Sequence, residues 1–367
     1  MFVPVVDQDQ HPLMPTTPAR AGRWIKSGKA TPFWKGGVFC VRLNSDPSAR
    51  AVQPIAIGID PGSKREGYSV ISAAHTYLNI QAEARDGVKD AEEQSTQMRR
   101  TRRARTTPCR KPRQNRKQSK KKLPPSTRAR WQWKLRLARF LCQLFPVCVF
   151  VVEDIKARTQ GKRRWDQRFS PLEVGKQWFY MELGKLAPVQ TKQGYETKAL
   201  REQLGLKKTR KKLAEVWEAH CIDAWVLAES AVGGKTAPDN RRLVCVAPFA
   251  WHHRQLHRFQ PEKGGKRKPY GGTISQGIKR GTLVQHPKWG KATIGGTRNG
   301  KLSLHDPQTN KRLTQTANVT DCRPIKLLRW RTWLVPLAPL PTSPAPKKED
   351  LLAPRHKMRG VSASRVR

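Results

Sequence analysis

Acidic residues are scarce in this chain of 367 residues, which has 27 Asp and Glu against 73 Lys and Arg. The formal net charge is therefore +46. A compact protein with so much charge of one sign repels itself, so we expect it to bind a polyanion. Nucleic acid is the natural candidate, because each phosphate contact releases condensed counterions.

Long apolar runs and paired cysteines are also missing. No segment approaches the ~20 uncharged apolar residues of a membrane-spanning helix, and no N-terminal signal pattern is present. An anionic membrane is therefore the weaker alternative partner, and we expect a soluble protein of the cytoplasm. The seven cysteines are scattered without a Cys-x-x-Cys pair, which argues against a disulfide framework or a zinc ribbon.

Shifts in composition divide the chain into seven regions, and the central ones favour an α/β fold. Strand patterns at 54–60, 67–73 and 76–84 are separated by turns short enough for an antiparallel meander. Helical patterns and one more apolar strand, at 147–155, then indicate packed α/β layers. We place the region boundaries at 1–50, 51–89, 90–125, 126–200, 201–245, 246–335 and 336–367.

Three helices are predicted in the second half of this α/β part. The first covers 126–145, after a Ser/Thr cap, and the second covers 171–186. The third covers 211–232 and ends at Gly233. Its expected buried stripe, at steps of three and four residues, consists of Leu213, Val216, Trp217, His220, Asp223, Ala224 and Leu227.

Acidic residues occupy places in this pattern where they are hard to explain structurally. Asp60 and Glu153 each end an apolar strand, and Asp223 lies in the stripe with His220. Burying an unpaired carboxylate costs several kcal/mol, whereas a single core histidine is more often structural than catalytic.

Converging carboxylates would repel one another, and bound Mg²⁺, or Mn²⁺ in its place, would resolve this. Two such ions ~3.5 to 4 Å apart would suit phosphodiester hydrolysis. The structural alternative is that each acid is a separate cap or surface charge.

Basic residues dominate 99–122, where thirteen are Lys or Arg and none is acidic. Acids at 90–93 would suit a helix N-terminus, and Pro108 would end that helix. Its arginines leave no apolar face to bury, so we interpret it as an arm between phosphates rather than as a disordered linker. The candidate RNA-binding residues are Arg99, Arg100, Arg102, Arg103, Arg105, Arg110 and Arg113.

The C-terminal regions have a different composition. Gly pairs separate short alternating strands such as GTLVQH, KATIGG and KLSLHD, which predicts a small twisted, β-rich module within 246–335. The remaining 336–367 are Pro-rich and basic, and we expect them to be flexible.

Several of these stretches together resemble one group of proteins. HPLMPTTPARAGRWIKSGKA, GIDPGSKREGYSV, MRRTRRAR, VVEDI, GYETKALREQLGLKKT and EAHCIDAWVLA are similar to the transposon-encoded IscB proteins, relatives of the RNA-guided CRISPR nucleases. The resemblance implies a ribonuclease H-like RuvC domain split into three segments (51–89, 126–200 and 201–245). It also implies an N-terminal PLMP region at 1–50 and an Arg-rich bridge helix within 90–125.

One departure from the IscB pattern narrows the resemblance. IscB proteins carry an HNH nuclease between the second and third RuvC segments, and that chemistry needs histidines. This chain has no histidine between His75 and His220, so it resembles IsrB, the group without HNH. The family then implies a nickase: a single protein copy binds a long structured guide RNA, and RuvC cuts the displaced strand of double-stranded target DNA beside a short motif.

The resemblance also assigns roles to residues. Asp60, Glu153 and Asp223 would hold the metal ions, and His220 would orient or deprotonate the water. The module at 246–335 would read the target-adjacent motif and contact the RNA. Two alternatives from other classes stay open, namely a protein-only junction-resolving RuvC-like nuclease and a non-catalytic protein that binds transposon RNA.

Overall fold

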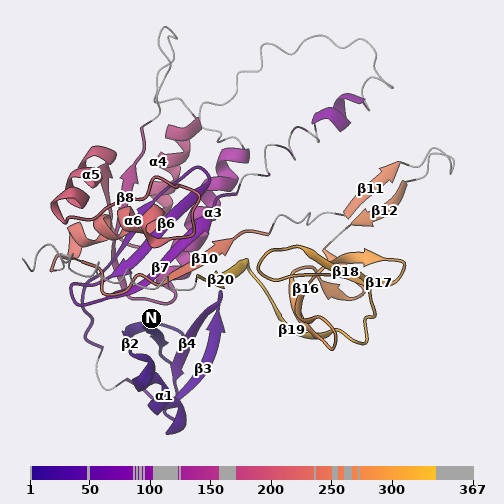
Figure 1. Cartoon of the computed structure of the whole chain (residues 1–367), viewed down its shortest axis with the longest axis horizontal. Helices are drawn as coiled ribbons and strands as arrows, with labels where there is room; N and C mark the ends of the chain where they lie inside the picture. Colours follow the sequence, from indigo (N-terminus) through magenta and orange to yellow (C-terminus); the bar gives the residue numbers. More distant parts are fainter. Residues whose placement is uncertain are drawn as a thin grey trace, which may run out of the picture. The chain divides into compact units, whose positions relative to one another are not determined.

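The computed structural model of the protein describes residues 2–47, 50–85, 87, 90, 93, 96–101, 123, 125–156, 171–234, 237–249, 255–259, 267–271 and 273–335 (Figure 1). The predicted mixed α/β class is confirmed. Three larger sheets hold most of the strands. Among these residues, no helix is long and apolar enough to cross a membrane.

The largest sheet has seven strands in the order β20-β10-β7-β6-β5-β8-β9. The expected antiparallel meander forms its centre, where β6 pairs antiparallel with both β5 and β7. Then β8 pairs parallel with β5, and β9 parallel with β8. The strands are β5 (Ile55–Asp60), β6 (Arg65–Ile71), β7 (Thr76–Glu83), β8 (Val147–Asp154), β9 (Val189–Gln193), β10 (Leu243–Ala247) and β20 (Arg331–Leu334).

Helices cover both faces of this sheet. On one face, α3 (Pro125–Cys142) and α4 (Pro171–Gly184) share an apolar core with Ile57 and Ile59 of β5. On the other, α6 (Trp217–Val232) packs with Ala56 of β5. Because side chains alternate along a strand, Asp60 lies on the same face as Ala56. The last residue of β5 is therefore placed on the α6 side.

Two glycines bring α6 unusually close to the sheet. A Cβ added at Gly58 of β5 would lie 1.7 Å from the carbonyl oxygen of Ala224, and one at Gly67 of β6 would lie 2.3 Å from that of His220. Side chains at these two positions would push the helix away. The glycines therefore allow the His220–Ala224 turn of α6 to lie directly on the strands that flank Asp60.

The predicted third helix is shorter than expected. Its expected start at residue 211 is wrong, because α6 begins at Trp217 and Val216 is extended (φ −134°, ψ 150°). Leu213 and Val216 are 57% and 38% exposed, so they do not belong to the buried stripe. The carbonyls of Lys212 and Ala214 instead accept hydrogen bonds from His220 Nε2 and Gln81 Nε2, at 2.9 and 3.0 Å. These bonds hold 212–214 as a loop beside the sheet.

Residues 2–47 form a small separate sheet, which the composition of this region did not reveal. Its strand order is β2-β1-β4-β3, with β1 (Val3–Val6), β2 (Pro12–Thr16), β3 (Ala30–Lys35) and β4 (Val38–Leu43). Helix α1 (Pro18–Lys26) starts where Thr17 caps the N–H of Arg20 and Pro18 takes the first turn. The Pro-rich segment thus supplies a strand and a helix start.

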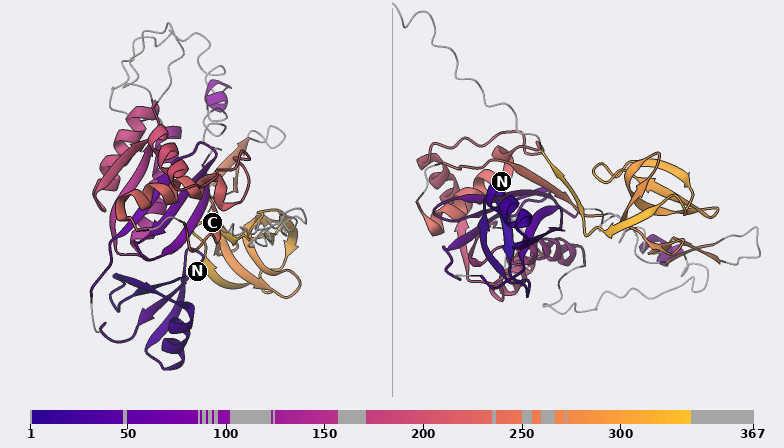
Figure 2. Two further views of the ribbon diagram at one scale, coloured as in Figure 1. Left: turned by 60° about the vertical axis from the view of Figure 1, so that its left-hand side comes forward. Right: turned by 90° about the horizontal axis from the view of Figure 1, so that it is seen from below.

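The expected β-rich module contains a five-stranded antiparallel sheet in the order β18-β17-β16-β15-β19, which is strongly curved in Figure 2. These strands are β15 (Thr282–His286), β16 (Gly290–Arg298), β17 (Lys301–His305), β18 (Arg312–Ala317) and β19 (Arg323–Leu327). Short hairpins precede them: β11 (Gln255–Phe259) with β12 (Arg267–Gly271), and β13 (Ile274–Ser275) with β14 (Ile278–Lys279).

The end of the module differs from the expected boundary at residue 335. Strand β20 pairs antiparallel with β10 and so belongs to the seven-stranded sheet. The chain therefore leaves that sheet after β10 and returns to it at β20. The six cysteines within the described ranges are all free thiols.

We predict that Gly58→Ala destabilises the protein by more than ~3 kcal/mol, the upper end of ordinary overpacking, because the new methyl group would collide with backbone rather than with a movable side chain. Urea denaturation of the purified chain measures this. Gly22→Ala in α1, where a Cβ meets nothing within 4 Å, is the matched control and should be neutral or stabilising. Equal unfolding midpoints for Gly58→Ala and wild type would contradict the close contact.

Candidate active site

Two acidic residues lie side by side at the end of the parallel pair β5–β8. The register pairs Ile59 with Val152, so the next residues, Asp60 and Glu153, are neighbours on adjacent strands. Both lie on the α6 face of the sheet, and their carboxyl groups share a hydrogen bond. Such a bond requires one of the two to carry a proton.

The surroundings decide which of the two carboxyl groups is protonated. Burial, together with the adjacent Asp60 carboxylate, raises the pKa of Glu153 to about 8. Burial also opposes ionisation of Asp60, but the hydrogen bond from His220 and the positive charge of Lys208 outweigh it, and the pKa of Asp60 is lowered. Near neutral pH, Glu153 therefore carries the shared proton and Asp60 is ionised.

His220 connects α6 to the same carboxylate. Its Nδ1 lies 2.9 Å from Asp60 Oδ2, and its Nε2 lies 2.9 Å from the carbonyl oxygen of Lys212. A carbonyl only accepts hydrogen bonds, and so does an ionised carboxylate. Both ring nitrogens are thus engaged, and His220 fixes Asp60 in place in this arrangement.

Asp223 lies one helical turn further along α6 and is neutralised by two cations. Its carboxylate oxygens pair with Arg201, from α5 (Gly194–Gln203), and with Lys208 in the loop that follows. Lys208 Nζ also lies 4.0 Å from Asp60 Oδ2. One ammonium group therefore lies between two of the three candidate metal ligands.

Asp154, the residue after Glu153, points the other way. It is hydrogen-bonded to Lys176 Nζ and Gln193 Nε2 at 2.6 and 2.7 Å, and to the Tyr180 hydroxyl at 3.2 Å. Lys176 and Tyr180 belong to α4, on the opposite face. The alternation along β8 thus separates a structural aspartate from the candidate catalytic glutamate.

The donor set at this edge fits a hard divalent cation. Asp60, Glu153 and Asp223 offer only carboxylate oxygens, which Mg²⁺ prefers, and the proton shared by Asp60 and Glu153 signals an excess of negative charge. In the arrangement described, Arg201 and Lys208 balance that charge. Binding of a metal by all three acids therefore requires Asp223 to exchange these two partners.

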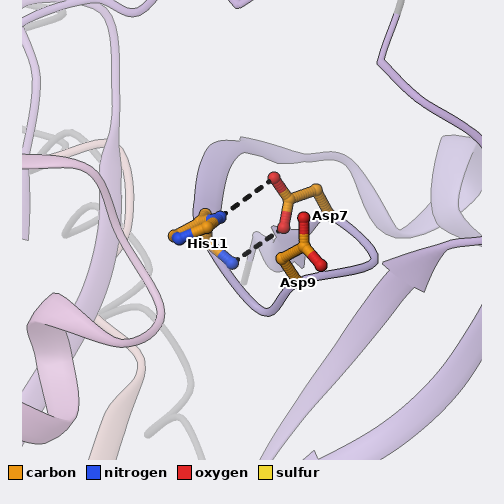
Figure 3. A group of neighbouring side chains, drawn as sticks. All are labelled: Asp7, Asp9 and His11. Carbon is orange, nitrogen blue, oxygen red and sulfur yellow. Dashed lines mark hydrogen bonds and ion pairs between the residues drawn. The ribbon is translucent and has the colours of Figure 1, made fainter.

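A second acidic group lies in the N-terminal sheet. Within the described ranges, the group whose possible ligand atoms all lie within 4.8 Å of one another is Asp7, Asp9 and His11, shown in Figure 3. Asp7 is already engaged, because its carboxylate accepts the His11 N–H at 2.8 Å and pairs with Arg50 at 3.1 Å. These contacts close the β1–β2 turn, which gives the group a structural role.

The predicted RNA-binding arginines lie only partly within the described residues. Arg99 and Arg100 belong to the helical stretch 96–101. The remaining five, Arg102, Arg103, Arg105, Arg110 and Arg113, lie outside the described residues. Their role stays a prediction.

Comparison with known proteins identifies a family similarity in the N-terminal part. The family described as "RRXRR protein" matches residues 3–164, which include Asp60 and Glu153. The chain has Arg-Arg-Thr-Arg-Arg at 99–103, the pattern in the family's name. No curated protein matches the chain.

Two solved structures are similar over about half of the chain. The structure described as T. thermophilus RuvC in complex with Holliday junction substrate is 14% identical, covers 50% of this chain and 98% of that one, and has a TM-score of 0.26. The Thermus thermophilus RuvC structure is 13% identical, with coverages of 49% and 97% and a TM-score of 0.27.

We predict a pH-dependent stability difference between wild type and Glu153→Gln in the presence of a chelator. The pKa of Glu153 is about 8 when folded, against an ordinary value of 4.5, so the folded chain binds the extra proton between these values. Stability from this group therefore falls as pH rises through that window. Gln cannot ionise, so the melting temperature of the variant should exceed that of wild type increasingly from pH 6 to 8.5.

The matched control is Glu202→Gln, at a side chain that is 63% exposed on α5. Its melting temperature relative to wild type should be constant over the same pH range. A constant difference for Glu153→Gln as well would contradict the shared proton.

Proposed function

We propose that this protein is an RNA-guided, Mg²⁺-dependent DNA endonuclease that nicks the displaced strand of its target. The observation that carries the proposal is the convergence of Asp60, Glu153, His220 and Asp223 at one edge of the sheet, where Asp60 contacts both Glu153 and His220. Carboxylates from two strands and a helix are the ligands that divalent cations prefer, and such ions would activate a phosphodiester for hydrolysis.

The chain's own residues prepare this chemistry. Bound Mg²⁺ would supply a Lewis acid and lower the pKa of a coordinated water. His220 fixes the Asp60 carboxylate from the helix side through the bond to Nδ1. Lys208, at 4.0 Å from Asp60, is placed to contact a phosphate oxygen once Asp223 turns to the metal. To act on a water, His220 would have to release the Lys212 carbonyl from its Nε2. That role, and the contact of Lys208 with phosphate, belong to the proposal.

The topology supports a ribonuclease H-like, RuvC-type assignment. In chain order, β5, β6 and β7 form the meander, and β8 and β9 add in parallel on the other side of β5. Numbered from β5, the spatial order is 3-2-1-4-5, the order of that fold. The acids lie on its first and fourth strands, and α6 brings the third acid.

Three observations support a guide RNA. The RRXRR family, found in IscB-type proteins, matches a region that includes both Asp60 and the arginine-rich segment. The net charge of +46 favours a binding partner with more phosphates than the DNA strand that is cut. The third observation is a groove along α3, described next.

The α3 groove is lined by four arginines and one acid. Arg128, Arg136 and Arg139 follow one side of α3, and Arg329 precedes β20. Along the helix, Arg128 and Arg136 are about 12 Å apart. The floor includes Trp178 and Phe140, and the acid is Glu182, which pairs with Arg139 at 3.2 Å. Among the described residues, Arg128, Arg136 and Arg329 form no salt bridge, so the groove presents three guanidinium groups without an acidic partner.

The position of the groove favours RNA over the strand that is cut. Helix α3 covers the sheet face opposite α6, whereas Asp60 and Glu153 open toward α6. Burial and the nearby charge of Arg329 lower the pKa of Arg136, a sign that like charges are held together there. A phosphate backbone in the groove would relieve this repulsion.

The described residues contain one candidate catalytic site at the sheet edge, and one site would cut one strand. The sequence from 76 to 219 contains no histidine, so it offers no HNH site for the other strand. The two alternatives remain a protein-only junction-resolving nuclease and a non-catalytic RNA-binding protein. The arginine-rich segment and the module at 246–335 disfavour the first, and the buried acidic cluster disfavours the second.

We predict that the protein with its copurified RNA converts a matched supercoiled plasmid to the relaxed form, with less than ~10% linear product, because one site cuts one strand. Asp60→Ala should lower this activity by at least ~10³-fold, since the group that links Glu153 and His220 is lost. Gel electrophoresis of the plasmid measures both.

Ribonuclease treatment and RNA binding are the controls for that assay. Ribonuclease should abolish nicking by the wild type, and Asp60→Ala should retain RNA affinity. Activity that survives ribonuclease would favour the junction-resolving alternative. Nicking by Asp60→Ala at the wild-type rate would remove the catalytic role of the site, and efficient linearisation would remove the nickase assignment.

We predict that Arg128→Glu with Arg329→Glu weakens RNA binding at least tenfold and lowers the slope of log K against log salt by about 2, because two phosphate contacts are lost. Filter binding over a salt series measures this. Lys26→Glu with Lys29→Glu, in and after α1, makes the same change in net charge away from the groove and should weaken binding less. Equal effects of the two pairs would show that only net charge matters.

A further inference from the structure

A buried ion pair lies behind the candidate site, on the opposite face of the sheet. Lys134 of α3 contacts Glu66 of β6, and the two residues are 4% and 1% exposed. Around them the layer between α3 and the sheet is apolar, with Trp131, Leu137 and Ile59 in the same core. The Lys134–Glu66 pair belongs neither to the carboxylate cluster nor to the lining of the α3 groove.

Both charged groups have further partners. Glu66 Oε2 accepts a hydrogen bond from the Tyr68 hydroxyl at 2.8 Å. Lys134 Nζ donates to the carbonyl oxygen of Gly62 at 3.2 Å, and it lies 5.5 Å from the ring centre of Trp131. The Lys134 ammonium therefore joins helix α3, strand β6 and the β5–β6 turn.

The turn that Lys134 contacts begins directly after Asp60. Residues 61–64 connect β5 to β6, and Asp60 pairs with Gly67 across the two strands. A Cβ added at Gly62 would lie 1.6 Å from the carbonyl oxygen of Arg65, so the turn is tight. A shift of the Gly62 carbonyl would be transmitted to Asp60 over two residues.

Stability alone does not explain a charged pair at this place. Removing two charges from water is unfavourable, and well-packed apolar residues in their place are often equally stable or more so. The neighbouring positions of α3 are filled by such residues. What apolar side chains cannot supply is a donor for the Gly62 carbonyl.

We propose that Lys134 is a positioning residue of the active site: held by Glu66, it anchors the Gly62 carbonyl and so fixes the Asp60 carboxylate for divalent-cation binding. The inference depends on the proposed function only in that the acidic cluster binds a metal. It assigns to α3, on the far face of the sheet, control over the geometry of Asp60.

Mn²⁺ titration of the full-length chain, followed by electron paramagnetic resonance of the free ion, tests this. The variant is Lys134→Met with Glu66→Gln, which removes both charges together and avoids an unpaired buried charge. We expect a melting temperature near that of wild type and about tenfold weaker Mn²⁺ binding at the site, as for other residues that orient metal ligands. Lys198→Met with Glu202→Gln, an exposed pair on α5, is the matched control and should change neither quantity.

Asp60→Asn separates the two hypotheses. If Asp60→Asn leaves Mn²⁺ binding unchanged, the acidic cluster is not a metal site and the proposed function fails. If Asp60→Asn weakens binding but the double variant binds Mn²⁺ like wild type, only the positioning role of Lys134 is overturned. Loss of affinity in both, with the melting temperature of the double variant retained, supports it.

Tyr68→Phe tests the positioning role of Lys134 if the double variant does not fold. It removes only the hydroxyl that holds Glu66 and keeps the ion pair. We expect a folded protein with two- to threefold weaker Mn²⁺ binding, since Glu66 and with it Lys134 gain freedom. Unchanged Mn²⁺ affinity in this variant would then overturn the proposal.

Discussion

The close contact between α6 and the glycines of β5 and β6 is the constraint on which the candidate site depends. Gly58 and Gly67 let the backbone of Ala224 and His220 lie where side chains would normally stand. Only at that separation does the His220 ring reach Asp60 at 2.9 Å. The apolar residues of β5 set the position of the sheet, but the missing side chains set the position of the helix.

The candidate site is rich in acidic groups, whereas the chain as a whole is strongly basic. Although the protein carries a formal charge of +46, its acidic cluster is buried tightly enough that Glu153 keeps a proton near pH 7. Lys208 and Arg201 balance Asp223 from the side of α5. The cations of the site therefore neutralise local acids, and under the proposed function the arginines of α3 bind external phosphates.

Much of the arrangement follows from patterns in the sequence, and the exceptions have physical reasons. Apolar runs ending on Asp60 and Glu153 predicted two acids at one sheet edge, and helical spacing placed His220 and Asp223 on one face. The sequence predicts a start of α6 that is too early, because Leu213 and Val216 continue the apolar period. In the structure, hydrogen bonds to the carbonyls of Lys212 and Ala214 hold this segment as a loop. Helical period alone does not register such tertiary bonds.

Other features of the structure left only a weak signal in the sequence, or none. The alternation of small residues in β5 and β6 could have indicated close helix packing, since glycine inside a strand often marks such an approach. The pairing of Lys134 with Glu66 had no local signal, because the two residues are 68 positions apart. Lys208 also had no local signal, because it is one of many lysines in a basic chain. Long-range pairs between charged groups depend on the register of the whole sheet.

Under the proposed function the two faces of the sheet have different partners, which would explain why both are charged. In that proposal, the acids of the α6 face bind metal cations, whereas the arginines of the α3 face bind phosphates. If both polyanion contacts lay on one face, the acids would repel the bound backbone and the arginines would compete with the metal. The sheet lies between the two helix layers and keeps the two kinds of contact apart. Lys134 of α3 donates a hydrogen bond to the turn after Asp60, and under the proposed positioning role this contact links the two faces mechanically.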